Sequence, residues 1–162
     1  MYDDGRQTLS RRFLRGLFRP FFWHIQRQSK GKNAEKLIDD YRAALDESIE
    51  KYGVDARRTN TVRDYLAKHL EGLEKYSDAL PLRKVQFEMM RETEGIDSFD
   101  ALVSGNALAA DLIGTGELEE ARTLLLSLFD QQSVQGTLGA EQGLYTVRLI
   151  DQVNRFWPQQ SD

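Results

Sequence analysis

The feature of this sequence that most constrains its fold is an internal similarity with a period of 42 residues. Six positions of one stretch match six positions of the next in size, small residues falling opposite small ones and large opposite large. The first set is Leu66, Ala67, Leu70, Tyr76, Ala79 and Leu82, and the second is Leu108, Ala109, Leu112, Leu118, Ala121 and Leu124. Self-similarity at a fixed period of this length indicates supersecondary units that stack on one another.

The spacing of apolar residues indicates that these units are helical. From Asn33 onward apolar residues recur at intervals of three and four, and period-two alternation is not sustained over the length of a strand. Glycines mark the expected turns at Gly31, Gly53, Gly72, Gly95, 114–116 and 136–143. We therefore expect an all-α fold in which antiparallel helices are joined by short connections.

The matched alanines mark expected points of close helix approach. Ala67 and Ala109 fall on the first helix of each pair, and Ala79 and Ala121 fall on the second. A larger side chain at these positions would wedge the helices apart. The alternative is an ordinary helical bundle in which two hairpins agree by chance.

These residues resemble the tetratricopeptide repeat family in its long, 42-residue form, as in kinesin light chains. Residues 106–121 are similar to that family's asparagine–leucine–alanine first helix, glycine turn and glutamate–alanine second helix. Residues 64–85 depart from the pattern, because Glu74 stands where the turn glycine usually sits and Arg83 stands at a usually large apolar position. The resemblance implies an α-solenoid, a right-handed stack of two to three helix pairs.

Partial matches extend the repeats in both directions. Residues 31–45 resemble the turn and second helix of an earlier repeat, whose first helix would come from residues 20–28. Residues 144–157 are expected to form a C-terminal capping helix. We thus expect a basic aromatic N-terminal arm at 1–30, a helical repeat domain at 31–158 and a short tail at 159–162.

The resemblance also implies a binding surface, because the first helices of such pairs line a concave groove. An asparagine at the position of Asn106 commonly hydrogen-bonds the backbone of a bound peptide in this family, and the alternative is that it faces water. The predicted partner-binding residues of the groove are Thr61, Asp64, Lys68, Glu71, Val103, Asn106, Ala110 and Ile113.

The N-terminal arm differs from the body in charge. Residues 1–32 carry eight Lys and Arg against two Asp, a balance of +6, whereas the remainder carries 14 basic and 24 acidic residues, a balance of -10. On a helix with 100° per residue, Phe13, Leu14, Leu17, Phe18 and Phe21 fall on one side and Arg12, Arg15 and Arg19 on the other. Pro20 is expected to break this helix and begin a second segment.

Four roles remain open for the arm. It could lie on an anionic membrane surface, dock into a larger protein assembly, bind nucleic acid, or form the first helix of the first repeat with its aromatic residues in the core. Nucleic acid is disfavoured, because no motif supports it and the acidic body would repel phosphates. The candidate docking residues are Arg11, Arg12, Phe13, Arg15, Leu17, Phe18, Arg19, Phe21, Phe22 and Trp23.

The sequence gives no sign of a catalytic, metal or cofactor site. Cysteine is absent, and the two histidines, His24 and His69, do not have metal-ligand spacing. Gly114-Thr115-Gly116 lacks the length and the lysine of a phosphate-binding loop. We expect no catalytic residues, no metal and no cofactor.

These features together predict a non-enzymatic protein–protein interaction module. We expect an adaptor, scaffold or peripheral structural subunit of a larger complex, attached through its arm. The alternative is a regulatory or accessory domain of an enzyme whose catalytic site lies in another chain. No signal peptide or membrane span is expected, and the expected location is the cytoplasm or the matrix side of an organelle, with peripheral membrane association as an option.

Overall fold

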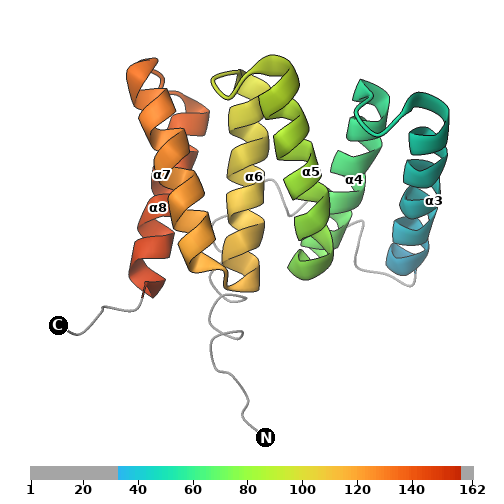
Figure 1. Cartoon of the computed structure of the whole chain (residues 1–162). Helices are drawn as coiled ribbons and strands as arrows, with labels where there is room; N and C mark the ends of the chain where they lie inside the picture. Colours follow the sequence, from blue (N-terminus) through green and yellow to red (C-terminus); the bar gives the residue numbers. More distant parts are fainter. Residues whose placement is uncertain (1–32, 158–162) are drawn as a thin grey trace, which may run out of the picture. The chain divides into compact units, whose positions relative to one another are not determined.

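The structure is a computed structural model that describes residues 33–157 (Figure 1). All regular structure in this part of the chain is α-helical, which confirms the predicted all-α class of packed antiparallel helix pairs. The helices are α3 (Ala34–Tyr52), α4 (Arg57–Gly72), α5 (Tyr76–Glu94), α6 (Phe99–Thr115), α7 (Leu118–Val134) and α8 (Glu141–Phe156). The N-terminal arm and the C-terminal tail lie outside the described residues.

The helix starts follow the 42-residue period. First helices begin at Arg57, Phe99 and Glu141, in α4, α6 and α8. Second helices begin at Ala34, Tyr76 and Leu118, in α3, α5 and α7. Each interval within these two series is 42 residues, so the period seen in the sequence also sets the start of one helix before the matched hairpins and one after them.

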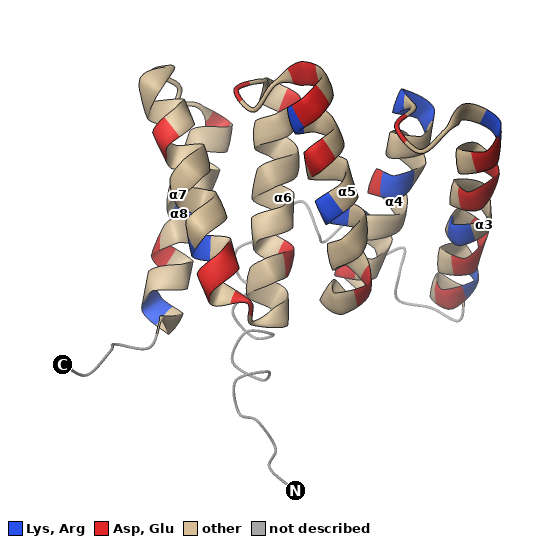
Figure 2. Cartoon of the chain, in the orientation of Figure 1, with Lys and Arg blue, Asp and Glu red and all other residues tan. Residues whose placement is uncertain are grey.

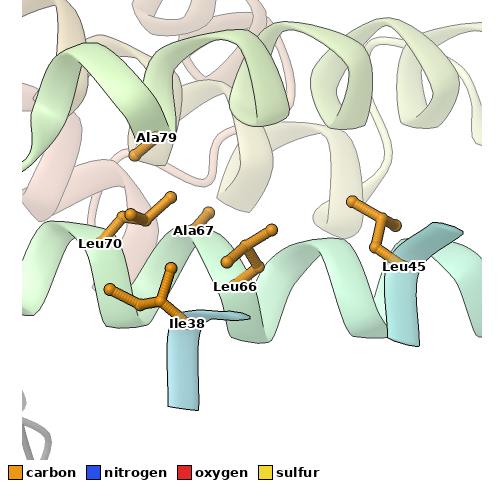
Figure 3. Close-up of a cluster of buried hydrophobic side chains, with 6 residues drawn as sticks. All are labelled: Ile38, Leu45, Leu66, Ala67, Leu70 and Ala79. Carbon is orange, nitrogen blue, oxygen red and sulfur yellow. The ribbon is translucent and has the colours of Figure 1, made fainter. Parts of the chain in front are cut away.

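Two compact units make up the chain, and the boundary between them falls inside α5, after Gln86. The first unit holds α3, α4 and the first half of α5, and its core is an apolar cluster (Figure 3). Ile38 and Leu45 come from α3, Leu66, Ala67 and Leu70 from α4, and Ala79 from α5. The two alanines are fully buried, as predicted from their size and spacing.

The core of the second unit is built in the same way. Its largest contributions are Leu108, Ala109 and Leu112 from α6, Ala121, Leu125 and Leu128 from α7, and Leu149 and Val153 from α8. Here α8 packs against both α6 and α7. Its outer side carries exposed Asp151 and Asn154 at the positions where α6 carries buried Ala109 and Leu112. Within residues 33–157 no further helix covers this side, and its polar residues suit the capping helix that the sequence predicts.

Equivalent turns connect the helices of the two central pairs. Glu74 has φ 61°, and the equivalent Gly116 has φ 87°. In both turns the next residue donates its backbone N–H back to a leucine carbonyl, Lys75 to Leu70 at 2.9 Å and Glu117 to Leu112 at 2.8 Å. The missing glycine therefore leaves the turn intact, although a side chain in the left-handed region costs about 1–2 kcal/mol.

Gly143, in the first turn of α8, packs directly against the preceding backbone. A Cβ atom there would lie 2.5 Å from the Leu138 carbonyl oxygen and 2.6 Å from the Thr137 carbonyl oxygen. Because backbone atoms cannot rotate away, Gly143→Ala is expected to lower the free energy of unfolding by about 1–3 kcal/mol despite alanine's higher helix propensity. Urea denaturation checks this.

Gly139 supplies the control, since a Cβ atom there would meet nothing within 4 Å. Gly139→Ala should change the free energy of unfolding by no more than about 0.5 kcal/mol. Equal urea midpoints for the two variants would contradict the close packing at Gly143.

Candidate partner-binding surface

The four predicted groove residues of the first unit lie on α4 and differ widely in exposure. Thr61 is exposed, and its hydroxyl donates to the Arg57 carbonyl at 3.0 Å. Asp64 and Lys68 are half-buried, and their side chains form an ion pair of 2.5 Å. Glu71 is buried. Thr61 and Lys68 therefore remain the accessible members of this group.

Arg83 of α5 forms ion pairs with both Glu71 and Asp64 of α4, which explains why a charged Glu71 is tolerated in a buried position. Its guanidinium is only 2% exposed. Its Nε donates to Glu71 at 2.6 Å, and one terminal nitrogen donates to Asp64 at 2.7 Å and to Gln86 at 2.6 Å. We call Asp64, Lys68, Glu71, Arg83 and Gln86 the Arg83 network. It joins the two helices of this pair by charge-assisted hydrogen bonds, where α7 has the apolar Leu125 at the equivalent position.

The charges of this network hold one another in the ionised state. Burial by itself would raise the pKa of Asp64, but the Arg83 charge and the hydrogen bonds from Lys68 and Arg83 outweigh burial and lower that pKa below its ordinary value. Burial likewise disfavours the charged form of Arg83, yet Glu71 and Asp64 raise its pKa above the ordinary value. Arg83 is therefore a cation at any working pH.

On α6 the structure corrects the expected orientation of three residues. Val103 is partly exposed, but Ala110 and Ile113 are buried, and Asn106 is only 1% exposed. The Asn106 side-chain oxygen accepts a hydrogen bond from Thr146 at 2.9 Å, and its nitrogen donates to the Gln142 backbone and side-chain oxygens, both at 3.3 Å. Asn106 thus links α6 to α8, and it faces neither water nor an open groove.

The expectation that all eight residues point outward is therefore wrong for Glu71, Asn106, Ala110 and Ile113. These residues were assigned from the family resemblance and from their spacing on the first helices, and neither shows which neighbouring helix covers a given side. For Glu71 and Asn106 the polar partners lie 12 and 36–40 residues away along the chain. No local pattern identifies such partners in advance.

Two aromatic residues missed by the sequence reasoning enlarge the accessible surface. Phe99, one helical turn before Val103, is 67% exposed, and Tyr65, one turn after Thr61, is also exposed. The Tyr65 ring stacks on Tyr41 of α3 with centroids 6.0 Å apart. An aromatic residue four positions from a predicted contact lies on the same helix face, and that spacing could have identified both.

The accessible side chains form two patches, one in each unit. The α4 patch consists of Thr61, Tyr65 and Lys68, and the α6 patch consists of Phe99 and Val103. Exposed aromatic side chains are typical anchors of protein interfaces. The predicted docking residues of the arm, 11–23, lie outside the described part of the chain.

His, Asp and Glu are the side chains of residues 33–157 that could bind a metal ion. In this range His, Asp and Glu side chains form no group of three that could hold a metal ion. His69 turns its Nδ1 to the Tyr65 carbonyl at 2.8 Å, so that nitrogen carries the proton, and its ring lies 4.9 Å from that of Tyr41. These contacts fix the ring among its neighbours on α3 and α4.

None of the helices in the described range is both long enough and apolar enough to cross a bilayer. No protein-family model matches the sequence, and no curated protein shows significant similarity to it. A functional proposal therefore rests on the residues and contacts of this chain.

Proposed function

We propose that this chain is a non-enzymatic protein–protein interaction module of the tetratricopeptide-repeat type, serving as an adaptor or peripheral structural subunit of a larger complex. The observation that carries the proposal is the 42-residue spacing of the helix starts together with the full burial of alanines at matched positions. Stacked helix pairs of this kind leave part of each first helix accessible, and such surfaces typically bind other proteins.

The α4 and α6 patches are the proposed contact surfaces of the body. The α6 patch offers apolar area, because Phe99 and Val103 lie one turn apart and are both accessible. The α4 patch combines an aromatic ring with the polar ends of Thr61 and Lys68. Aromatic anchors surrounded by polar groups are the usual composition of an interface with a protein.

The arm is the proposed attachment point to the complex. Residues 1–32, which include the arm, have a charge balance of +6 against -10 for the remainder of the chain, so the arm is suited to an acidic surface. We propose that this surface belongs to a protein assembly on the cytoplasmic or organelle-matrix side of a membrane. The anionic membrane itself is the competing target.

A quantitative binding experiment tests the proposal. The tagged full-length chain is incubated with native membrane and soluble extracts, bound proteins are identified by mass spectrometry, and each candidate is then purified and titrated calorimetrically. Phe99→Ala is expected to weaken binding of the true partner at least about tenfold, since anchoring aromatics commonly contribute about 2 kcal/mol or more. Val134→Ser, at an apolar residue on α7 that is 89% exposed, is the matched control and should bind as the wild type does.

The arm is tested in the same titration with Arg12, Arg15 and Arg19 changed to Glu. Lost binding to the purified partner would support docking on a protein, whereas lost pelleting with anionic vesicles alone would assign the arm to the membrane. Equal affinity of all variants for every candidate would overturn the proposal. Measuring the activity of a partner that is an enzyme would separate an adaptor from a regulatory subunit.

A further inference from the structure

One side of the first helices is buried in α4 and α6 but exposed in α8. Within residues 33–157 α8 is a first helix that no second helix follows. The buried positions are Asn60, Arg63, Ala67 and Leu70 in α4, and Leu102, Gly105, Ala109 and Leu112 in α6. In α8 the equivalent residues are Leu144, Val147, Asp151 and Asn154, all exposed, which we call the α8 strip.

The second helices show the converse difference. Within the same range α3 is a second helix that no first helix precedes. Three positions are buried in the other second helices, as Ala79, Arg83 and Gln86 in α5 and as Ala121, Leu125 and Leu128 in α7. In α3 the equivalent residues are Leu37, Tyr41 and Ala44, all only half-buried, which we call the α3 strip.

We propose that the α8 strip of one copy of this chain packs on the α3 strip of a second copy. The two copies then complete a helix pair of the same kind as α6 and α7, in which α8 is the first helix and α3 the second. This inference does not depend on the proposed function, because neither strip contains a residue of the α4 patch or the α6 patch.

The sharpest support comes from the crossing of Val147 with Ala44. These residues are equivalent to Gly105 of α6 and Leu128 of α7, which lie so close that a Cβ atom on the glycine would be 3.0 Å from both leucine methyl carbons. Valine and alanine together have as many side-chain carbon atoms as leucine and glycine. The exchange of sizes between the two helices therefore preserves the volume at the crossing, as close packing requires.

The polar half of the α8 strip also has a counterpart on α3. Asp151 and Leu37 are equivalent to Ala67 and Ala79, which lie in one buried cluster (Figure 3), so Asp151 would meet the first turn of α3. The first N–H groups of a helix have no partner within the helix, and Asn33 makes no side-chain capping bond to them. A carboxylate is favoured at this positive end of a helix.

Opposite charges border the two strips. Acidic residues are prominent along α3 (Figure 2), and exposed Asp40 and Glu47 border the α3 strip on the side opposite the α4 core. Exposed Arg148 and Arg155 border the α8 strip. Two α3 strips in contact would bring these carboxylates together, whereas contact with α8 brings them towards arginines. The charges therefore favour the unlike pair of strips.

Tyr41 gives these arginines a specific contact. It stands at the position of Arg83, and Arg148 and Arg155 stand at the positions of the two α4 carboxylates that Arg83 contacts. In the pair formed by two copies, a half-buried tyrosine ring would therefore meet two guanidinium groups. Such groups are attracted to the face of an aromatic ring.

Cross-linking of two single-cysteine variants tests the contact in the full-length protein, which has no cysteine of its own. Isotope-labelled Val147→Cys is mixed with unlabelled Ala44→Cys, and in the control with Ala43→Cys, the exposed neighbour on α3. After mild oxidation, mass spectrometry quantifies the disulfide between labelled and unlabelled chains. We expect a yield at least about tenfold higher with Ala44→Cys, because a disulfide requires Cα atoms within about 7 Å. Equal yields, or a predominant disulfide between two Val147→Cys chains, would overturn the proposal.

Sedimentation velocity measures the association without a covalent link. The average mass of the wild type should increase with its concentration, because a contact between two different surfaces lets copies add in succession. Val147→Asp should weaken this association at least about tenfold, since it places an unpaired charge in the contact. Val85→Asp on α5 is the matched control, because Val85 and Val147 are both 42% exposed. A wild type that stays monomeric at every concentration would assign the α3 strip to another occupant and overturn the proposal, as would equal weakening by the two variants.

Discussion

Replacing Arg83 by leucine is expected to lower the free energy of unfolding by about 3–5 kcal/mol, the usual cost of removing one partner of a buried ion pair. The loss has a specific physical origin. Glu71 is buried and pairs with the guanidinium of Arg83, which also pairs with half-buried Asp64. The substitution therefore leaves Glu71 without its cation and leaves Asp64 with Lys68 alone. Urea denaturation measures the difference. Arg42→Ala is the control, because its pairs with Asp39 and Asp78 are exposed and should contribute at most about 1 kcal/mol.

The residues at equivalent positions of the second unit indicate how the stability lost in Arg83→Leu can be restored. The positions equivalent to Arg83, Glu71 and Asp64 hold Leu125, Ile113 and Asn106 there. A triple variant, Arg83→Leu with Glu71→Ile and Asp64→Asn, should regain most of the lost stability, because replacing a whole buried charge cluster by apolar residues is often neutral. If the triple variant is no more stable than Arg83→Leu alone, the loss does not arise from the orphaned carboxylates.

Lowering the pH should reduce the difference in the free energy of unfolding between the Arg83→Leu variant and the wild type. The pKa of Asp64 is depressed in the folded protein, so its contribution to stability is present above its unfolded pKa of about 3.9 and is lost as the pH falls through the lower folded value. The variant lacks Arg83, one of the two cations that lower this pKa, and keeps only Lys68. Urea denaturation from about pH 6 to about pH 3 checks the prediction, and a difference that stays constant over this range would contradict it.

Replacing Ala109 by leucine should cost about 1–3 kcal/mol through overpacking. Ala109 has no exposed surface, and the same is true of Ala67, its equivalent on α4. Three additional carbon atoms at such a position must displace a neighbouring side chain or separate two helices. For a chain of this length each 1 kcal/mol corresponds to about 2–4 °C in melting temperature, so calorimetry resolves the effect.

Ala67→Leu should produce a loss of similar size in the first unit, because both alanines occupy the same place in their pairs. The exposed Ala43 on α3 serves as the control, and Ala43→Leu should stay within about 0.5 kcal/mol of the wild type. A tolerated Ala109→Leu would mean that the helices do not approach closely at this point, and the proposed equivalence of the repeats would lose its physical basis.

The predicted contact surface shows where reasoning from sequence fails. The eight groove residues were chosen by their place on the first helices, and four of them are buried. Asn106 is hydrogen-bonded to Thr146 and Gln142, and Glu71 is hydrogen-bonded to Arg83. Arg83 stood out in the sequence as a charged residue at a usually apolar position, but the two carboxylates that balance it belong to a helix with its own separate pattern.

The features that depend on neighbours along the chain could be predicted before the structure: the helical class, the 42-residue period, the turns between helices and the small residues at close crossings. Each of these arises from local spacing, or from side-chain size repeated at a fixed interval. Which polar side chains are buried and paired became visible in the folded arrangement alone, because a buried charge or amide is tolerated where its partners converge from other helices. That convergence is a property of packing, and it decides which surface of the chain remains accessible to a partner.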